Sequence, residues 1–203
     1  FAKAVVFAVS DTATAIAALN DSSSFTFSTP GENPTGLTIV GGTVRAAGSG
    51  TGSTGTNFNQ ASIMFNGGGE RSVTLDNVYN TSSGNETLSF QLIYGNSSNG
   101  GENLDANEEV VLRYSTDSGS SWTTHTTYAL ATYQQSDFVD VSVNLTGNLA
   151  ANSIMFQLSQ PSNSGIDYDH FAIDTLTISV SSDAAIDEAT TVTASTTATT
   201  AQA

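Results

Sequence analysis

The densest group of chemically capable side chains in this sequence lies at residues 167–174. Asp167 and Asp169 stand close together, and Asp174 follows inside an apolar run. Carboxylate and carbonyl oxygens at such spacing can wrap a hard cation such as Ca2+. Because an unpaired charge inside an apolar strand is costly, we expect Asp174 to be paired, hydrogen-bonded to loop amides or bound to a metal. These three aspartates are therefore candidate metal ligands.

An acidic segment at residues 102–109 offers a second place for a cation. Its Asp105 alternates with asparagine and glutamate residues in the manner of a loose calcium loop. The glycine that an EF-hand loop needs is missing, so a solvated turn explains the segment equally well. Asp105 joins the candidate ligands, and both interpretations stay open.

Residues able to carry out catalysis are scarce, and we predict that the protein is not an enzyme. The chain has two histidines, His125 and His170, one lysine, Lys3, and no cysteine, which excludes disulfides, thiolate chemistry and cysteine-ligated zinc. Neither the G-x-S-x-G turn of hydrolases nor the H-E-x-x-H pair of zinc proteases occurs. A formal G-x-G-x-x-G at residues 50–55 has no helix after it, so it is not a nucleotide site.

The charge of the chain limits its partners. There are 19 acidic residues against 4 basic ones, which gives a formal net charge of −15. This charge repels phosphate backbones and anionic membrane surfaces. No segment is apolar over the length needed to cross a bilayer. The sequence therefore predicts no nucleic-acid binding and no membrane insertion, and its charge suits divalent cations.

Short apolar runs between Gly, Ser and Asn turns fill residues 21–180 and must position these side chains. Their period of two, clearest at Leu88, Phe90 and Leu92, is typical of strands with one buried face. Such spacing predicts an all-β fold, an antiparallel jelly-roll β-sandwich, with extended N- and C-terminal segments at residues 1–20 and 181–203. The strands are expected near residues 25–27, 37–44, 63–65, 73–75, 88–94, 110–114, 138–145, 154–158 and 171–180.

Three segments together carry a resemblance to a known family. They read Ile-Met-Phe-Asn-Gly-Gly-Gly-Glu-Arg at residues 63–71, Val-Leu-Arg-Tyr-Ser-Thr-Asp-Ser-Gly-Ser-Ser-Trp at residues 111–122, and Gln-Pro-Ser-Asn-Ser-Gly at residues 160–165 running on to Phe-Ala-Ile-Asp at residues 171–174. In this order they resemble the jelly roll of reelin repeats, which also occurs in many bacterial secreted proteins. The resemblance covers about residues 25–180 and implies an extracellular or cell-surface location, with a structural Ca2+ near the returning strand. The cysteines and the inserted EGF-like unit of reelin repeats are missing, so only the jelly-roll core is implied.

The segment 114–122 also has a physical interpretation of its own. Its centre forms a tight turn in which Asp117 caps the backbone and Gly119 takes a positive φ. Trp122 then returns on the partner strand, either as a core residue that covers the hairpin or as a stacking surface for a sugar. The second alternative makes the chain a secreted carbohydrate-binding module with glycans as partners. Sequons that mark candidate glycosylation sites stand at Asn80, Asn85, Asn96 and Asn144.

The N-terminal segment is apolar at alternate positions and must be covered. Val5, Phe7 and Val9 share one face of an extended strand, and Ile16 continues the β-branched choices. Three arrangements would cover it. The segment folds back on its own sandwich, it completes the sheet of the next copy by donor-strand exchange, or it forms an Ala-rich helix. Exchange builds a head-to-tail homopolymer. We predict a structural subunit of an extracellular filament or surface adhesin, with the carbohydrate-binding module as the alternative.

Overall fold

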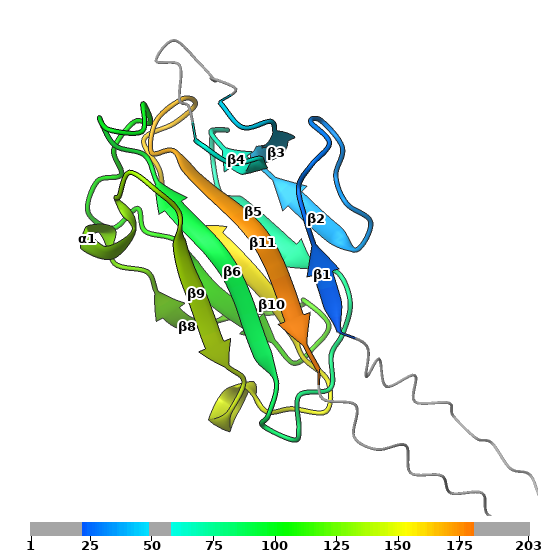
Figure 1. Cartoon of the computed structure of the whole chain (residues 1–203). Coiled ribbons are helices and arrows are strands. Elements are labelled where there is room, and N and C mark those ends of the chain that lie inside the picture. Colours follow the sequence, from blue (N-terminus) through cyan, green and yellow to red (C-terminus); the bar gives the residue numbers. More distant parts are fainter. Residues whose placement is uncertain (1–21, 49–57, 181–203) are drawn as a thin grey trace, which may run out of the picture.

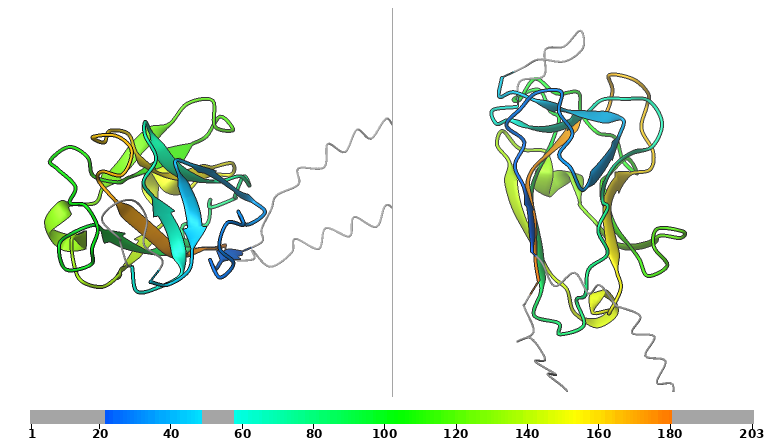
Figure 2. Two further views of the ribbon diagram at one scale, coloured as in Figure 1. Left: turned by 90° about the horizontal axis from the view of Figure 1, so that it is seen from above. Right: turned by 90° about the vertical axis from the view of Figure 1, so that its right-hand side faces the viewer.

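Two antiparallel sheets packed face to face make up the structure, a computed structural model that describes residues 22–48 and 58–180 (Figure 1). The six-stranded sheet has the order β3-β4-β11-β6-β9, with β1 paired to the C-terminal part of β11. The five-stranded sheet has the order β2-β5-β10-β7-β8. The right-hand view of Figure 2 shows the two layers edge-on. The predicted all-β jelly-roll sandwich is confirmed.

Most strands lie where the sequence predicts them, but β1 shares only Phe25 with the expected strand at residues 25–27, and β8 lies outside the expected ranges. The six-stranded sheet contains β1 (Ser23–Phe25), β3 (Gly42–Arg45), β4 (Ser62–Phe65), β6 (Thr87–Tyr94), β9 (Val139–Asn144) and β11 (Phe171–Ser179). The five-stranded sheet contains β2 (Leu37–Val40), β5 (Arg71–Leu75), β7 (Val111–Ser115), β8 (Thr123–Thr127) and β10 (Met155–Gln160). Two short helices, α1 (Leu130–Tyr133) and η1 (Gly147–Leu149), lie in connections and were not predicted.

Several predictions fall on segments outside the described residues. These segments are the flanking parts 1–20 and 181–203 and the G-x-G-x-x-G at 50–55. The assembly residues Val5, Phe7, Val9 and Ile16 therefore stay predictions. In the part of the chain that the structure describes, no helix has the length and apolar character needed to cross a bilayer.

Apolar residues at alternate positions supply the core between the sheets. On β6, Leu88 and Phe90 are buried in this core, whereas the residues between them are partly exposed. Phe65 of β4 and Phe171 of β11 stack with their ring centroids 4.3 Å apart. Each large apolar side chain contributes roughly 1.5–3 kcal/mol on full burial. The period-two pattern thus decides which face of each strand meets the other sheet.

One expected strand, residues 37–44, is divided into two strands in different sheets. The division falls at Gly41, whose φ of +66° lies in the left-handed region that favours glycine. A Cβ atom at this position would also lie 2.9 Å from Cγ of Arg71. The chain therefore leaves the five-stranded sheet after β2 and enters the six-stranded sheet as β3. Both halves contain β-branched residues, and Leu37, Ile39 and Val44 predict a single strand.

Candidate functional site

A fully buried arginine holds together the loops at one end of the sandwich. Arg71 is the first residue of β5, and its exposed fraction is 0%. Its N–H groups donate to Gly67 O (2.6 Å, from Nε), Gln160 Oε1 (2.9 Å, Nη1), Asp169 O (2.6 Å, Nη1), Gly165 O (2.8 Å, Nη2) and Tyr168 O (2.8 Å, Nη2). Because the five guanidinium N–H donors lie in one rigid plane, all of these acceptors are fixed together. Arg71 therefore fastens the loop at 161–170 to β5 and to the end of β10.

Carboxylates around Arg71 compensate its charge. Burial lowers the pKa of Arg71 to about 10, and the nearby Asp169 and Glu108 act against this shift. The guanidinium therefore stays charged at neutral pH. Burial, together with the neighbouring Asp169 carboxyl group, raises the pKa of Glu108. Glu102 also joins the group, because its carboxylate accepts the backbone N–H of Asp169 at 2.5 Å.

The structure brings two of the predicted calcium ligands into the loop that Arg71 holds. Asp167 accepts a hydrogen bond from Nδ2 of Asn66 at 2.8 Å, and the buried Asp169 accepts the backbone N–H of Ser164 at 2.5 Å. Asp105 is exposed in the acidic segment before β7, where Glu108 accepts its backbone N–H at 2.9 Å. The Asp169 carboxylate thus bonds within its own loop, the Asp167 carboxylate bonds to a residue of another loop, and Asp105 lies in a different segment.

Asp174 lies apart from the other candidate ligands. It pairs in register with Gln91 on the outer face of the six-stranded sheet, at an irregularity where the other neighbour of β11 changes from β4 to β1. Burial raises the pKa of Asp174, and the N–H of Thr175 donates to its carboxylate at 2.7 Å. Among residues 22–48 and 58–180, no three or more His, Asp or Glu side chains gather to hold a metal. The calcium site therefore stays a prediction.

His170 belongs to the packing around Arg71. It is fully buried, and its Nδ1 accepts the backbone N–H of Glu102 at 3.3 Å. Burial lowers the pKa of the imidazole, and the positive charge of Arg71 adds to this effect. A neutral, enclosed imidazole is suited to packing and hydrogen bonding, whereas a general acid–base group must reach a substrate. His125 lies on the exposed part of β8.

The outer face of the five-stranded sheet carries a continuous polar row that crosses all five strands. Strand register places one residue from each strand side by side, so a single line runs from β2 to β8. Its members are Thr38, Thr74, Gln157, Arg113 and Thr124. On β2, β5, β10 and β7 the apolar neighbours of these residues along the strand face inward, which leaves this face free for polar groups.

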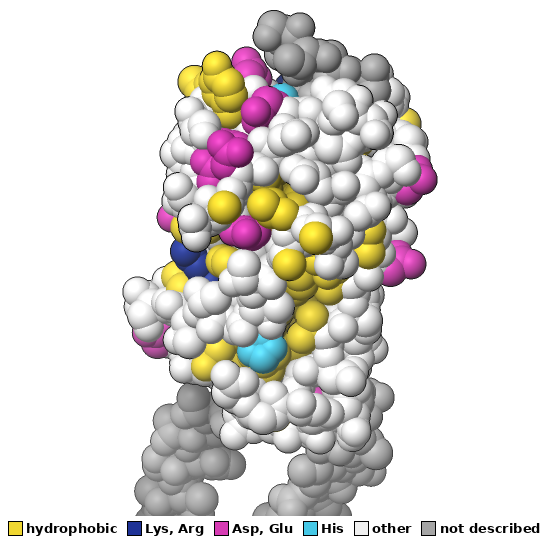
Figure 3. All heavy atoms as spheres, turned by 90° about the vertical axis from the view of Figure 1, so that its left-hand side faces the viewer, with side chains coloured by type: hydrophobic (Ala, Val, Ile, Leu, Met, Phe, Trp, Pro, Cys, Tyr) yellow, Lys and Arg dark blue, Asp and Glu magenta, His cyan; other side chains and the backbone are white. Residues whose placement is uncertain are grey.

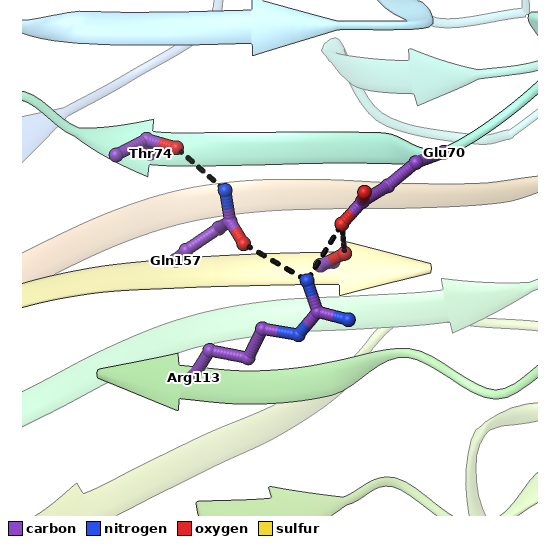
Figure 4. Close-up of polar contacts among 5 residues, drawn as sticks. Glu70, Thr74, Arg113 and Gln157 are labelled. Atoms are coloured by element: carbon purple, nitrogen blue, oxygen red, sulfur yellow. Dashed lines mark hydrogen bonds and ion pairs between the residues drawn. The ribbon is translucent and has the colours of Figure 1, made fainter. Parts of the chain in front are cut away.

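Hydrogen bonds hold the central members of the polar row in place (Figure 4). Nε2 of Gln157 donates to Oγ1 of Thr74 at 3.1 Å. Nη1 of Arg113 donates to Gln157 Oε1 at 3.5 Å and forms an ion pair with Glu70 at 2.6 Å. Ser159 also donates to Glu70, at 2.8 Å. The side chains are thereby oriented while further donors and acceptors remain available on the surface.

Trp122 stands beside this row at the end of the β7–β8 hairpin. The turn before it contains Gly119 with a φ of +84°, as predicted. A Cβ atom on Gly119 would lie 3.6 Å from the Trp122 ring and 3.8 Å from the sulfur of Met155. Met155 is on the outer face of β10, because its neighbour Phe156 is in the core. Trp122 is half-buried and flanks this face, so it is not a core residue.

Comparison with known proteins places the chain in a family. The model of Reelin subrepeat B matches residues 47–179, which is more than half of the 203 residues. The chain belongs to the Reelin subrepeat B family. Among curated proteins, none matches it.

Two solved structures are similar to this reelin-subrepeat domain at low sequence identity. A mutant of Xylanase10C from Cellvibrio japonicus in complex with xylopentaose has a TM-score of 0.39 and 10% identity over 75% of this chain. The domain spans 28% of that xylanase chain. TmCBM61 in complex with β-1,4-galactotriose has a TM-score of 0.35 and 11% identity, with 79% of this chain and 89% of that chain covered.

The four predicted glycosylation sites of the reelin-subrepeat domain differ in accessibility. Asn85 and Asn144 are exposed, whereas Asn80 and Asn96 are half-buried. Asn80 accepts a hydrogen bond from the hydroxyl of Ser82 at 2.7 Å, and Nδ2 of Asn96 donates to the carbonyl of Gln135 at 2.7 Å. Glycosylation stays a prediction at all four positions, and the exposed amides of Asn85 and Asn144 are the most accessible.

Replacement of Arg71 should destabilise the domain strongly. Arg71→Ala leaves five acceptor oxygens without their donors and the buried Asp169 carboxylate without its cation, so the free energy of unfolding should fall by about 3–5 kcal/mol. Urea denaturation measures this change. The matched control is Arg113→Ala, which removes an exposed ion pair and should cost about 0–1 kcal/mol. If Arg71→Ala does not fold, Arg71→Lys supplies the comparison. An equal fall in the free energy of unfolding in the Arg71 and Arg113 variants would contradict the role assigned to Arg71.

The turn before Trp122 should titrate at low pH. Hydrogen bonds from the hydroxyls of Ser121 (2.6 Å) and Ser115 (2.7 Å) lower the pKa of Asp117 to about 2. Since the folded pKa is depressed, the stabilising contribution is complete above the unfolded pKa of about 3.9 and is lost as pH falls toward 2. A carbon-detected NMR titration should show this midpoint, and Ser121→Ala should raise it. An ordinary aspartate midpoint in the unaltered chain would show that these bonds do not form.

Proposed function

We propose that this reelin-subrepeat domain is a non-enzymatic binding module of an extracellular surface protein, and that its ligand is a neutral glycan. The observation that carries the proposal is the polar row on the outer face of the five-stranded sheet, with Trp122 at its side. The family supports an extracellular location, because the reelin-repeat resemblance implies one. The buried, neutral His170 and the exposed His125 support a non-enzymatic role.

The chemistry of the face matches the chemistry of a sugar. A pyranose presents hydroxyls around its rim and C–H groups on its faces, so it is held by polar side chains together with an aromatic ring. Arg113 and Gln157 supply donors and an acceptor on one plane, and Trp122 supplies an apolar surface beside them. Because these polar side chains already hydrogen-bond to one another, a ligand orders them at little entropic cost.

The net charge decides the class of glycan. At −15, the chain repels sulfated, sialylated and uronic acid-rich sugars at long range. The Arg113 charge on the face is already paired with Glu70. The proposed ligand is therefore uncharged.

Removal of the indole ring should weaken glycan binding. Trp122→Ala eliminates the apolar surface, and affinity should fall at least about tenfold, or ~1.4 kcal/mol. Binding to an array of neutral glycans, followed by calorimetry on the best ligand, measures the loss. His125→Ala is the matched control on the same hairpin and should bind normally. Undiminished binding by Trp122→Ala, or no binding by the unaltered chain, would refute the proposed face.

Filament assembly is the second candidate function, and one observation favours it. Strands β8 and β9 each have a single neighbour in their sheets, so their outer edges are unpaired within the described residues. Figure 3 faces this side and shows hydrophobic side chains gathered along it. Half-buried apolar side chains packed against the core here include Tyr114, Leu130, Tyr133 and Val143. A free strand edge beside apolar groups is suited to β-strand addition.

The segment proposed to add to this edge is residues 3–9 of another copy. It lies outside the described residues, and its alternation of Val5, Phe7 and Val9 is what suits it to an extended partner. Main-chain hydrogen bonds would supply affinity, and the alternate side chains would set the register. Since each copy donates to the next, the assembly does not close and becomes a filament.

Deletion of residues 1–20 should abolish assembly if this second candidate is correct. The full chain should form particles whose mass rises with concentration in light scattering and fibres in electron micrographs. The deletion variant should be monomeric with an unchanged circular dichroism spectrum. A chain that lacks residues 181–203 serves as the matched control and should still assemble. A full chain that stays monomeric at high concentration removes this candidate and leaves glycan binding untouched.

A further inference from the structure

The connection between β1 and β2 borders a cavity that is open to solvent and that the sheet face does not use. It has a volume of about 280 Å3 and lies between residues 26–35 and β3. Trp122 is at the β7–β8 hairpin, and β2 and β8 are opposite edges of the five-stranded sheet. The cavity is therefore separate from the proposed glycan-binding face.

Six polar side chains line this cavity, and none of them has a hydrogen-bond partner among the described residues. They are Thr26, Ser28, Thr29, Glu32, Asn33 and Thr35. All six are exposed to solvent, whereas some polar side chains in other turns of the domain are bonded within the fold. The carboxylate of Asp117 and the amide of Asn99, for example, are fully engaged with their own turns. A set of unengaged donors and acceptors that converge on one hollow is available to a ligand.

The floor of the cavity is apolar. Phe27 and Val44 line it, with exposed fractions of 2% and 1%. Gly31 donates its N–H to the carbonyl of Val44 at 3.0 Å, which holds the connection over β3. The backbone thus defines a hollow with hydroxyls, an amide and a carboxylate around an apolar base.

This lining selects the class of ligand by elimination. Among the described residues no basic side chain lines the cavity, and Glu32 is acidic, so an anion is disfavoured. Glu32 is the single carboxylate that the described residues place there, whereas a divalent cation generally takes several charged oxygen ligands. A neutral ring with many hydroxyls fits, because a carboxylate and an amide each bind a pair of hydroxyls and the apolar base receives a C–H face. The volume lies just below the range of about 300–1,000 Å3 for drug-sized ligands, which suits one sugar ring.

We propose that this cavity binds one neutral pyranose unit, with Glu32 and Asn33 as its principal hydrogen-bonding groups. The site shares its ligand class with the proposed function but does not depend on the sheet face. A free monosaccharide and the end of a glycan chain present the same ring, and they differ only in what extends from it.

Nitrogen-15 NMR of the full chain tests the site. Neutral methyl glycosides of glucose, galactose, mannose and xylose are titrated to tens of millimolar, and the amides of residues 26–35 should shift with at least one of them. Glu32→Ala should weaken this binding at least tenfold, while Glu70→Ala, an exposed glutamate on the sheet face, should leave it unchanged. Oligosaccharides with the same terminal sugar then separate the two sources, since tighter binding than the methyl glycoside indicates a chain end.

The outcomes distinguish this site from the sheet face. Shifts in residues 26–35 that survive Trp122→Ala and vanish in Glu32→Ala establish the cavity whether or not the face binds glycans. Absence of shifts in residues 26–35 with every glycoside, or equal affinity in Glu32→Ala, overturns the cavity. If the cavity is overturned in this way and Trp122→Ala still loses binding to the glycan array, the proposed function of the sheet face stands and the second site is rejected.

Discussion

The need to satisfy a buried guanidinium governs one whole end of the sandwich. Arg71 has no exposed surface, so each of its N–H groups requires an oxygen within the fold. The carbonyls that meet this need come from a loop in which Asp167 and Asp169 have φ values of +63° and +51°. Those unusual conformations persist because the guanidinium fixes several carbonyls at once. The loop, the end of β10 and the start of β11 are consequently one unit.

The division of each strand into two faces explains how a stable domain can also present a binding surface. Inward positions must be apolar because the sheets bury them against each other, whereas outward positions carry no such demand. On β10, Phe156 and Leu158 fill the core while Gln157 between them joins the polar row. A recognition surface made of strand residues is held more rigidly than one made of loops. The packed core that stabilises the domain therefore also fixes the strand positions from which the outward side chains meet a ligand.

The sequence predicts the local features well and the non-local ones poorly. Alternation is visible within β6, and the turn at Gly119 has its own residue signature, so both were predicted. The polar row was missed because it depends on the register of five strands, although alternate polar residues in β7 and β10 hint at it. Asp174 was grouped with Asp167 because they are near in sequence, but an extended strand separates them. Nothing in the chain marks Arg71 as buried, since its acceptors are mostly backbone carbonyls from a distant loop.

The claim that the outer face of the five-stranded sheet is a glycan-binding surface has one direct test. Amide shift mapping of the full chain with neutral cello-, galacto- and xylo-oligosaccharides reports contact residue by residue. We expect shifts along β7, β8 and β10 and in the turn before Trp122, with the outer face of β6 and β9 unchanged. Shifts confined to β6 and β9, or none on the five-stranded sheet with any of these sugars, would contradict it.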